Sequence, residues 1–317
     1  MTNKISFTEF VQKLQLIEQI ADESVAKQYC IEDFFERNFP NMIITVVGLG
    51  LIGGSLCKTI KKHTNHTVYG VDIDKETIDM ALSQHAIDAE TNDLGLADIT
   101  IVSLYPLTTI DFIKANATKF KRGSIVIDTC GIKKAICDGV TDILEENDVT
   151  FIGVHPMAGR EFSGFEYSLD NLFDTASFII TPTEKTPQQK INLIEDFAYA
   201  INFKKVVKAT QQEHDQIIAF TSQLAHVVSN AYIKSPTGQK QLGFSAGSFQ
   251  DLTRVAKLNE DMWTPLFMLN KDPLVFEINY IIDRLTEYRD ALVDGDNPRL
   301  HDLLRDGRIL KEESKKL

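Results

Sequence analysis

The stretch 42–55, which reads MIITVVGLGLIGGS, decides the fold of this chain. Its first part, 42–47, is short, apolar and β-branched, which predicts a buried strand. Gly48, Gly50 and Gly53 follow at once in the pattern G-x-G-x-x-G. In this pattern the first glycine permits a tight turn, the second lets a pyrophosphate approach the backbone, and the third lets the next helix pack close to the sheet. The stretch therefore predicts a turn that binds a dinucleotide at a helix N-terminus.

An acidic residue completes this pattern. Asp72 follows a second predicted strand, about 20 residues after the glycines, where an acid binds the adenosine ribose and repels a 2′-phosphate. We therefore expect NAD as the cofactor, preferred over NADP. Asp74 is better interpreted as the N-cap of the next helix. The predicted cofactor-binding residues are Gly48, Leu49, Gly50, Leu51, Ile52, Gly53, Asp72, Ser103 and Asp128.

Composition limits the class of protein. The chain has 317 residues, of which 43% are hydrophobic and 25% charged, as in ordinary soluble globular proteins with room for two domains. A net charge of −12 argues against nucleic acid and anionic membranes as partners. The four cysteines are scattered, so we expect reduced thiols in a cytoplasm and neither a disulfide framework nor a metal site. We find no signal-peptide core and no spanning stretch.

The order of strands and helices predicts three segments. A helical N-terminal extension covers 1–40, a Rossmann-type α/β domain covers 41–208, and an all-helical substrate and dimerisation domain covers 209–317. Strands alternate with helices in the second segment, which predicts a parallel sheet with ligands at the carboxyl ends of its strands. The predicted strands are 42–47, 67–71, 99–103, 124–127, 150–153, 177–181 and 204–207. The predicted helices are 52–62, 75–84, 107–119, 133–146 and 187–200, then 211–232, 249–258, 264–269, 272–293 and 298–310.

Two residues stand out as candidates for chemistry. His155, in VHPMAGRE, directly follows a predicted strand, so its imidazole is expected at the strand's carboxyl end, facing the cofactor. Most single histidines are structural, but this place and the ordinary pKa of histidine favour a general base. Arg254, in SFQDLTRVA, needs an anionic partner within an apolar helical domain. That partner is either Asp251 or Glu260, or a substrate carboxylate held by two hydrogen bonds.

Weaker candidates lie in both domains. His214 and His226 share the predicted helix 211–232 and lie on roughly similar faces of it, without metal-ligand spacing. Trp263 either walls a pocket or fills core. Lys133 and Arg160 are lesser candidates for binding anionic groups.

Six blocks in this order carry a family resemblance: GLGLIGGS, DTCGIK, HPMAGREFSG, EHD, SQLAH, and SFQDLTRVA with a following MW. Together they closely resemble the prephenate dehydrogenase family of tyrosine biosynthesis, including its arogenate-using relatives. The resemblance runs from about Met42 to about Val293. It implies a Rossmann domain followed by a helical dimerisation domain, a homodimer, and NAD-dependent oxidative decarboxylation of prephenate to 4-hydroxyphenylpyruvate.

The resemblance also implies roles for particular residues. His155 corresponds to the catalytic histidine that bonds the ring hydroxyl of the substrate, and Arg254 to an arginine that binds a substrate carboxylate. His226 and the pair His214–Asp215 fall in blocks that line the pocket, and Trp263 corresponds to a tryptophan near it.

One position departs from the family pattern. Gly131 stands where many members have a serine that supports the histidine. We therefore expect another nearby group to hold His155, such as Thr129, the Cys130 region, a backbone carbonyl or water. We also expect Gly131 to have positive φ.

Alternative functions remain open. Prephenate and arogenate differ only at the side-chain keto or amino group, and the sequence does not separate them. A β-hydroxyacid dehydrogenase would share the two-domain plan but relies on a catalytic lysine in its helical domain. A non-enzymatic NAD-sensing protein is the third alternative, and the presence of both His155 and Arg254 counts against it.

Overall fold

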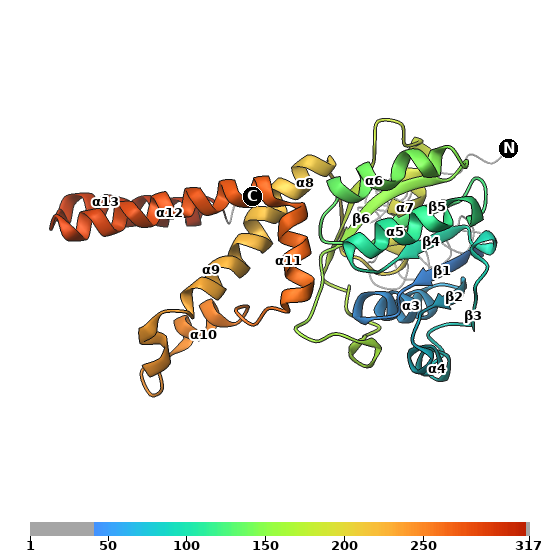
Figure 1. Ribbon diagram of the computed structural model, residues 1–317, viewed down its shortest axis with the longest axis horizontal. Coiled ribbons are helices and arrows are strands. Elements are labelled where there is room, and N and C mark those ends of the chain that lie inside the picture. The colour runs from blue at the N-terminus through green and yellow to red at the C-terminus, as the bar shows by residue number, and fades with distance from the viewer. Residues whose placement is uncertain (1–40, 315–317) are drawn as a thin grey trace, which may run out of the picture. The chain divides into compact units, whose positions relative to one another are not determined.

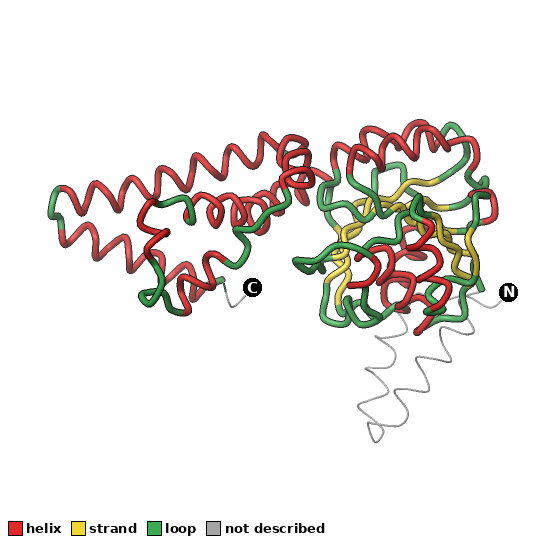
Figure 2. The backbone as a smooth tube through the Cα atoms, turned by 60° about the horizontal axis from the view of Figure 1, so that its bottom comes forward, coloured by secondary structure: helices red, strands yellow, loops and turns green. Residues whose placement is uncertain are grey.

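The structure is a computed structural model that describes residues 41–314. The predicted extension 1–40 lies outside the described residues. The chain divides into two compact units, unit 1 ending at Asp215 and unit 2 beginning at Gln216. Figures 1 and 2 show that unit 1 contains the sheet and that unit 2 is helical. This confirms the predicted fold class, an α/β nucleotide-binding sheet followed by a helical region.

Unit 1 is built on an eight-stranded sheet with strand order β3-β2-β1-β4-β5-β6-β7-β8. The strands are β1 (Ile43–Val47), β2 (Thr67–Val71), β3 (Ala89–Glu90), β4 (Ile99–Val102), β5 (Ile125–Asp128), β6 (Thr150–Pro156), β7 (Ser177–Thr181) and β8 (Lys205–Lys208). The first six are parallel, but β7 runs antiparallel to β6, so the prediction of a wholly parallel sheet was wrong there. The short β3 was not predicted either, because two residues give no periodic signal.

The buried strands explain why the sheet forms here. All four residues of β4 and all four of β5 are buried, as expected for strands covered on both faces. One hydrophobic cluster joins the sheet to α3 (Leu51–His63), α4 (Lys75–Ser83) and α7 (Gln188–Ala200). The helices α5 (Pro106–Asn116) and α6 (Lys134–Glu145) pack against each other alongside the sheet (Figure 1).

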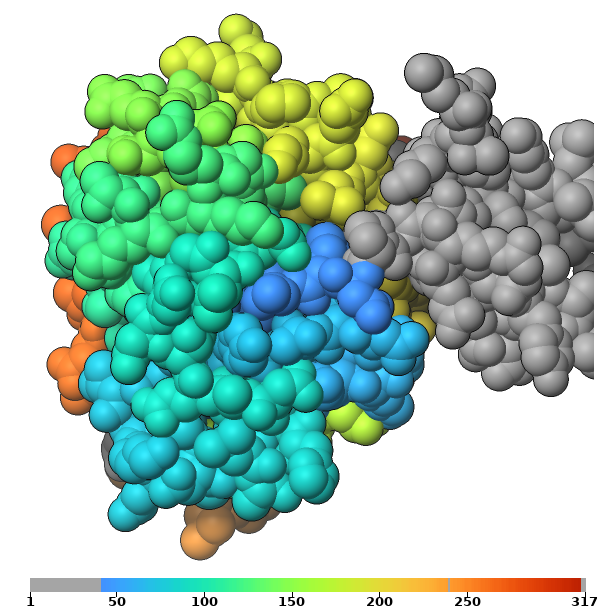
Figure 3. Space-filling model, turned by 90° about the vertical axis from the view of Figure 1, so that its right-hand side faces the viewer, coloured from blue at the N-terminus to red at the C-terminus, as the bar shows by residue number. Residues whose placement is uncertain are grey.

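The strand β1 lies inside the sheet, between β2 and β4. Figure 3 views the side of unit 1 where the described chain begins: the blue surface of this first segment lies between teal and yellow surface from later segments. Every residue of β1 after Ile43 is buried. The glycine turn that follows β1 is therefore held by a strand with neighbours on both sides.

The secondary-structure elements in the described part of unit 2 are all helices, joined by short loops. Its elements are the end of α8 (Gln211–Ile218), the π-helical η4 (Ala219–Leu224), α9 (Ala225–Tyr232), the 3₁₀ segment η5 (Pro236–Lys240), α10 (Gly247–Thr253), α11 (Glu260–Leu269), α12 (Lys271–Val293) and α13 (Asn297–Glu313). The predicted helix 211–232 is thus interrupted by η4, and the comparison of faces along a regular α-helix does not hold between His214 and His226. None of the described helices has the length and apolar character needed to span a membrane.

The core of unit 2 is small. Ala219, Leu224 and Leu274 are buried there, with partly buried neighbours such as Phe267 and Ile281. Many large apolar side chains on α12 and α13 are instead exposed, among them Phe276, Leu285, Leu292, Val293, Leu304 and Leu310. Exposed apolar side chains in this number on two helices are compatible with a surface that contacts another chain.

Candidate active site

The glycine turn of unit 1 has room for a phosphate group. Gly48 has φ of +85°, a conformation that side-chain residues rarely adopt. A Cβ on Gly53 would lie 1.9 Å from the Gly48 carbonyl oxygen, so this helix residue must be glycine. A Cβ on Gly50, by contrast, would meet nothing within 4 Å, so the backbone before α3 faces open space. Because Gly50 has no side chain to cap the helix, the first-turn amides of α3 can bind an anion.

Asp72 is fixed at the end of β2 by two backbone hydrogen bonds. The amide of Leu49 donates to one carboxylate oxygen at 2.7 Å, and the amide of Asp74 donates to the other at 2.9 Å. The acid is thereby tied to the glycine turn itself. Asp74 accepts a bond from the Glu76 amide and caps α4, as predicted. Ser103 lies beside the same turn, because a Cβ placed on Gly53 would come within 3.2 Å of the Ser103 Cβ.

Lys133 and Asp128 form a buried ion pair. Both side chains are fully buried, and the lysine Nζ lies 2.5 Å from a carboxylate oxygen of Asp128. The same Nζ donates to the carbonyl of Val154, and the Val154 amide donates to Asp128. The pair therefore joins the ends of β5 and β6. Lys133 was predicted to bind substrate and Asp128 to bind cofactor; the structure pairs the two side chains with each other in a buried position, and these roles stay predictions.

His155 lies within β6 and not after it, because β6 extends to Pro156. It still lies at the carboxyl edge of the sheet, two residues beyond Gly153, which pairs with the last residue of β5. Its ring is half-buried, and Nδ1 lies 2.9 Å from Nε2 of His214. Burial, and then the proximity of His214 and Lys133, hold the pKa of His155 well below its usual 6.5. The imidazole is therefore neutral near pH 7, as a general base requires.

His214 and Asp215 continue the contact from His155. His214 Nδ1 lies 2.7 Å from Oδ1 of Asp215, and both residues are buried. Asp215 also accepts the backbone amides of Lys133 at 2.8 Å and Lys134 at 2.9 Å, at the start of α6. We expected a nearby group to hold His155 in place of the missing serine, and His214, which was not among the groups named for this role, contacts its Nδ1. The adjacent pair His214–Asp215 was noted in the sequence. Nothing in the sequence, however, indicated that His214 contacts His155.

Gly131 lies next to the catalytic candidate. A Cβ built on it would be 3.8 Å from both Cε1 and Nε2 of His155, an ordinary van der Waals distance. Its φ is not among the positive ones, so the prediction of positive φ was wrong. The position therefore has space for a small side chain beside the Nε2 edge of the ring.

Unit 2 brings His226 and Trp263 together. Their ring centroids are 4.1 Å apart, and Trp263 also contacts Phe267. His226 Nδ1 lies 2.8 Å from the carbonyl of Ser222 in η4, so Nδ1 carries a proton and Nε2 faces away from that bond. π-Helical segments are rare and often occur at functional sites, and the sequence pattern gave no sign of η4.

Arg254 follows the last residue of α10 and is exposed. The segment around it is held to α9 by two hydrogen bonds, from Ser229 Oγ to the Leu252 carbonyl and from Asn230 Nδ2 to the Ala256 carbonyl. These two hydrogen bonds hold the backbone on both sides of Arg254 in place. Arg160, the lesser candidate, is exposed in unit 1 and lies over the ring of Phe162.

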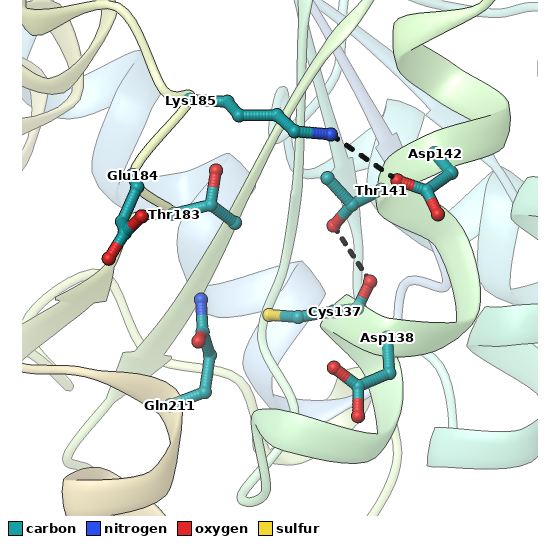
Figure 4. Close-up of a pocket in the computed structure, with 8 residues that line it drawn as sticks. All are labelled: Cys137, Asp138, Thr141, Asp142, Thr183, Glu184, Lys185 and Gln211. Carbon is teal, nitrogen blue, oxygen red and sulfur yellow. Dashed lines mark hydrogen bonds and ion pairs between the residues drawn. The ribbon is translucent and has the colours of Figure 1, made fainter.

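A separate pocket of about 500 Å³ lies beside α6. Figure 4 shows Lys185 directed at Asp142 and the Thr141 hydroxyl directed at the Cys137 carbonyl. None of the predicted site residues lines this pocket. Among the described residues, no group of three or more histidine, cysteine and acidic side chains has the arrangement to hold a metal ion.

The fold and the turn after β1 define the class: a nucleotide-binding protein with a Rossmann-type unit and a helical unit. The particular family follows from two matched regions. Residues 56–207 match the nucleotide-binding domain of prephenate dehydrogenase, and residues 210–306 match its dimerisation domain. The chain belongs to the prephenate dehydrogenase family.

Individual relatives agree with this assignment. The chain is 28% identical to prephenate dehydrogenase of Bacillus subtilis over 256 residues, which cover 77% of this chain and 67% of that protein. It is 29% identical to cyclohexadienyl dehydrogenase of Zymomonas mobilis over 267 residues, 80% of this chain and 90% of that one.

Solved structures show the same likeness. Prephenate dehydrogenase of Aquifex aeolicus, in complex with hydroxyphenyl propionate and NAD⁺, gives a TM-score of 0.76 at 26% identity, over 87% of this chain and 99% of that one. Arogenate dehydrogenase of Synechocystis gives a TM-score of 0.75 at 25% identity, over 86% and 100%.

Proposed function

We propose that this protein catalyses the NAD-dependent oxidative decarboxylation of prephenate to 4-hydroxyphenylpyruvate. The observation that carries the proposal is the neutral ring of His155 at the carboxyl edge of the sheet, with Nδ1 engaged by His214. In sheets of this kind, ligands bind at that edge. Family membership, and the Aquifex relative solved with NAD⁺ and hydroxyphenyl propionate, support the same reaction.

The glycine turn fits a dinucleotide. The open backbone at Gly50 and the first-turn amides of α3 would hold the pyrophosphate, and Asp72 would accept the hydroxyls of the adenosine ribose. Its negative charge disfavours a 2′-phosphate, so NAD⁺ is the proposed cofactor. When bound, NAD⁺ supplies the hydride acceptor for the ring carbon that bears the hydroxyl.

His155 is the proposed general base. Its Nε2 accepts the hydrogen bond of the substrate's ring hydroxyl and takes the proton as carbonyl character develops. The bond to the ring carboxylate then breaks, CO₂ leaves, and the electron pair of that bond aromatises the ring. The oxygen regains its proton from His155, which returns to the neutral form. Aromatisation makes the overall reaction effectively irreversible.

The substrate's charges call for cationic and aromatic contacts. Arg254 is the proposed partner of one carboxylate, because a guanidinium binds carboxylates through two parallel hydrogen bonds. His226, its ring fixed by the Ser222 carbonyl and by Trp263, is a proposed second contact. The substrate-binding roles of His226, Trp263 and Arg254 come from the family resemblance, and their geometry within unit 2 is compatible with them.

Arogenate is the second candidate substrate. The TM-scores to the Synechocystis arogenate dehydrogenase and to the Aquifex prephenate dehydrogenase differ by only 0.01, so the fold favours neither substrate.

We also propose a homodimer, since residues 210–306 match a dimerisation domain and the exposed apolar side chains of α12 and α13 would be covered in a dimer. Cys57, Cys130 and Cys137 are free and buried, in keeping with a proposed cytoplasmic setting.

The test is NADH formation, followed by absorbance, with prephenate, arogenate and a panel of 3-hydroxyacids. Each substrate is assayed with NAD⁺ and with NADP⁺. We expect the largest kcat/KM with prephenate and NAD⁺. Turnover of a hydroxyacid alone would reject the proposed function, and equal efficiency with NADP⁺ would reject the role given to Asp72.

A further inference from the structure

Asp215 is an unusual acid because the start of a helix holds it in place. Its two oxygens accept the amides of Lys133 and Lys134, the residues at the N-terminus of α6. Positive partial charge at a helix N-terminus favours the ionised carboxylate. An ionised carboxylate can only accept hydrogen bonds. The contact from Oδ1 to His214 therefore requires a proton on His214 Nδ1.

The proton positions on the two histidines follow from this. An imidazole protonated at Nδ1 alone presents a lone pair at Nε2. That atom faces Nδ1 of His155 at 2.9 Å, so Nδ1 of His155 must be the donor. A neutral His155 then carries its lone pair at Nε2, the atom next to Gly131.

We propose that Asp215 and His214 are positioning residues that fix the tautomer of His155, so that Nε2 is always the hydrogen-bond acceptor. The proposal rests on the proposed function in that Nε2 is the atom offered to the substrate hydroxyl. We call the chain of contacts from the N-terminus of α6 through Asp215 and His214 to His155 the relay. All of its residues lie within unit 1. The hydrogen bond to His214 orients the ring of His155 through Nδ1, while the small residue Gly131 leaves Nε2 accessible.

Burial and the groups around the ring keep it neutral. The groups that face His155 are His214 on α8 and the ammonium of Lys133, whose charge is paired with Asp128 at the end of β5. Asp215 contacts His214, which in turn contacts His155. Protonation of His155 would place a second cation beside Lys133 in a buried setting, which is unfavourable. Burial, His214 and Lys133 therefore all disfavour a charge on the ring, and the contact with His214 also fixes its tautomer.

Nitrogen NMR of the ¹⁵N-histidine-labelled full chain tests the proton positions without reference to activity. His155 is assigned by comparison with His155→Asn, and His214 with His214→Phe. We expect both rings of the unmodified protein to show a protonated Nδ1 and a bare Nε2 between pH 6 and 8. A His155 ring protonated at Nε2 would overturn the proposal. A wild-type chain that shows the expected tautomers but forms no NADH from prephenate or arogenate would reject the proposed function alone.

Kinetics of Asp215→Asn and His214→Phe test the consequence. Loss of a group that orients a functional histidine typically costs about 10–100-fold, and we expect that loss in kcat, with KM and NAD⁺ affinity within about twofold. The matched control is Glu213→Gln, which removes the same charge from the exposed neighbour on α8. Turnover of Asp215→Asn within twofold of the control, with the His155 tautomer unchanged, would contradict the relay.

Discussion

Residue 131 sets how closely other groups approach the Nε2 edge of His155. Because its φ is not positive and a Cβ there meets only ordinary contacts, Gly131→Ser can be accommodated without backbone strain. The new hydroxyl would, however, compete for the lone pair that the substrate hydroxyl needs.

We therefore predict that Gly131→Ser leaves turnover unchanged or lower, with no change in unfolding free energy. Gly131→Ala is the control, since it adds the Cβ without the hydroxyl. Steady-state kinetics decide the matter: a gain of about tenfold or more, which is about 1.4 kcal/mol, would show that the glycine is an uncompensated defect.

The buried pair Lys133–Asp128 predicts a large effect on stability. In Lys133→Met the Asp128 carboxylate loses its partner in a fully buried position. Breaking such a pair by removing one member costs about 3–5 kcal/mol. Urea unfolding should show this loss in Lys133→Met. Lys134→Met, which removes an exposed neighbour paired with Asp138, should cost less than about 1 kcal/mol. Equal losses in the two variants would show that the buried pair is not important for stability.

Among the elements, the β1–α3 turn makes the clearest prediction, because two of its glycines have opposite surroundings. Gly53→Ala forces a Cβ to within 1.9 Å of the Gly48 carbonyl and should displace α3, lowering the unfolding free energy and NAD⁺ affinity together. In Gly50→Ala the added Cβ meets no atom within 4 Å, so the unfolding free energy should stay unchanged. The Cβ would nevertheless fill the space proposed for the pyrophosphate, so NAD⁺ binding should weaken. Thermal unfolding and calorimetric titration separate the two. Unchanged NAD⁺ affinity in Gly50→Ala would place the pyrophosphate elsewhere.

Sequence patterns predicted elements better than contacts. Alternation of apolar runs located seven of the eight strands, because a buried strand has a strong compositional signature. It did not show the reversal at β7, since direction depends on how the chain returns to the sheet, nor η4, since a π segment in a helix keeps nearly the same apolar spacing. The candidate His155 was found from its place after a strand. Its partner His214 was named, but the bond between them joins segments far apart in sequence, and no local pattern records it.

At the scale of the whole molecule, buried histidines couple stability to pH. Burial lowers the pKa of His66 from 6.5 to about 4, and its Nδ1 accepts the backbone amide of Met42. The unfolded chain therefore binds a proton at a higher pH than the folded one, so stability is full above pH 6.5 and is lost as pH falls toward 4. His155 acts in the same direction.

We predict that the unfolding free energy of the wild type declines between pH 6.5 and 4, and that His66→Gln declines less over the same range. His301→Gln, at an exposed position on α13, should follow the wild type. Denaturant titrations at several pH values provide the comparison. A His66→Gln curve parallel to the wild type would mean that this histidine has the same pKa in both states.

The central claim is that His155 is the general base of an NAD-dependent dehydrogenase. The measurement that tests it most directly is the initial rate of NADH formation from prephenate by His155→Asn, taken together with the Kd for NAD⁺. We predict that turnover falls by about 10²–10⁴-fold, the usual contribution of a positioned acid or base, while the Kd stays within about twofold. Turnover within tenfold of the wild type, at unchanged NAD⁺ affinity, would contradict the account.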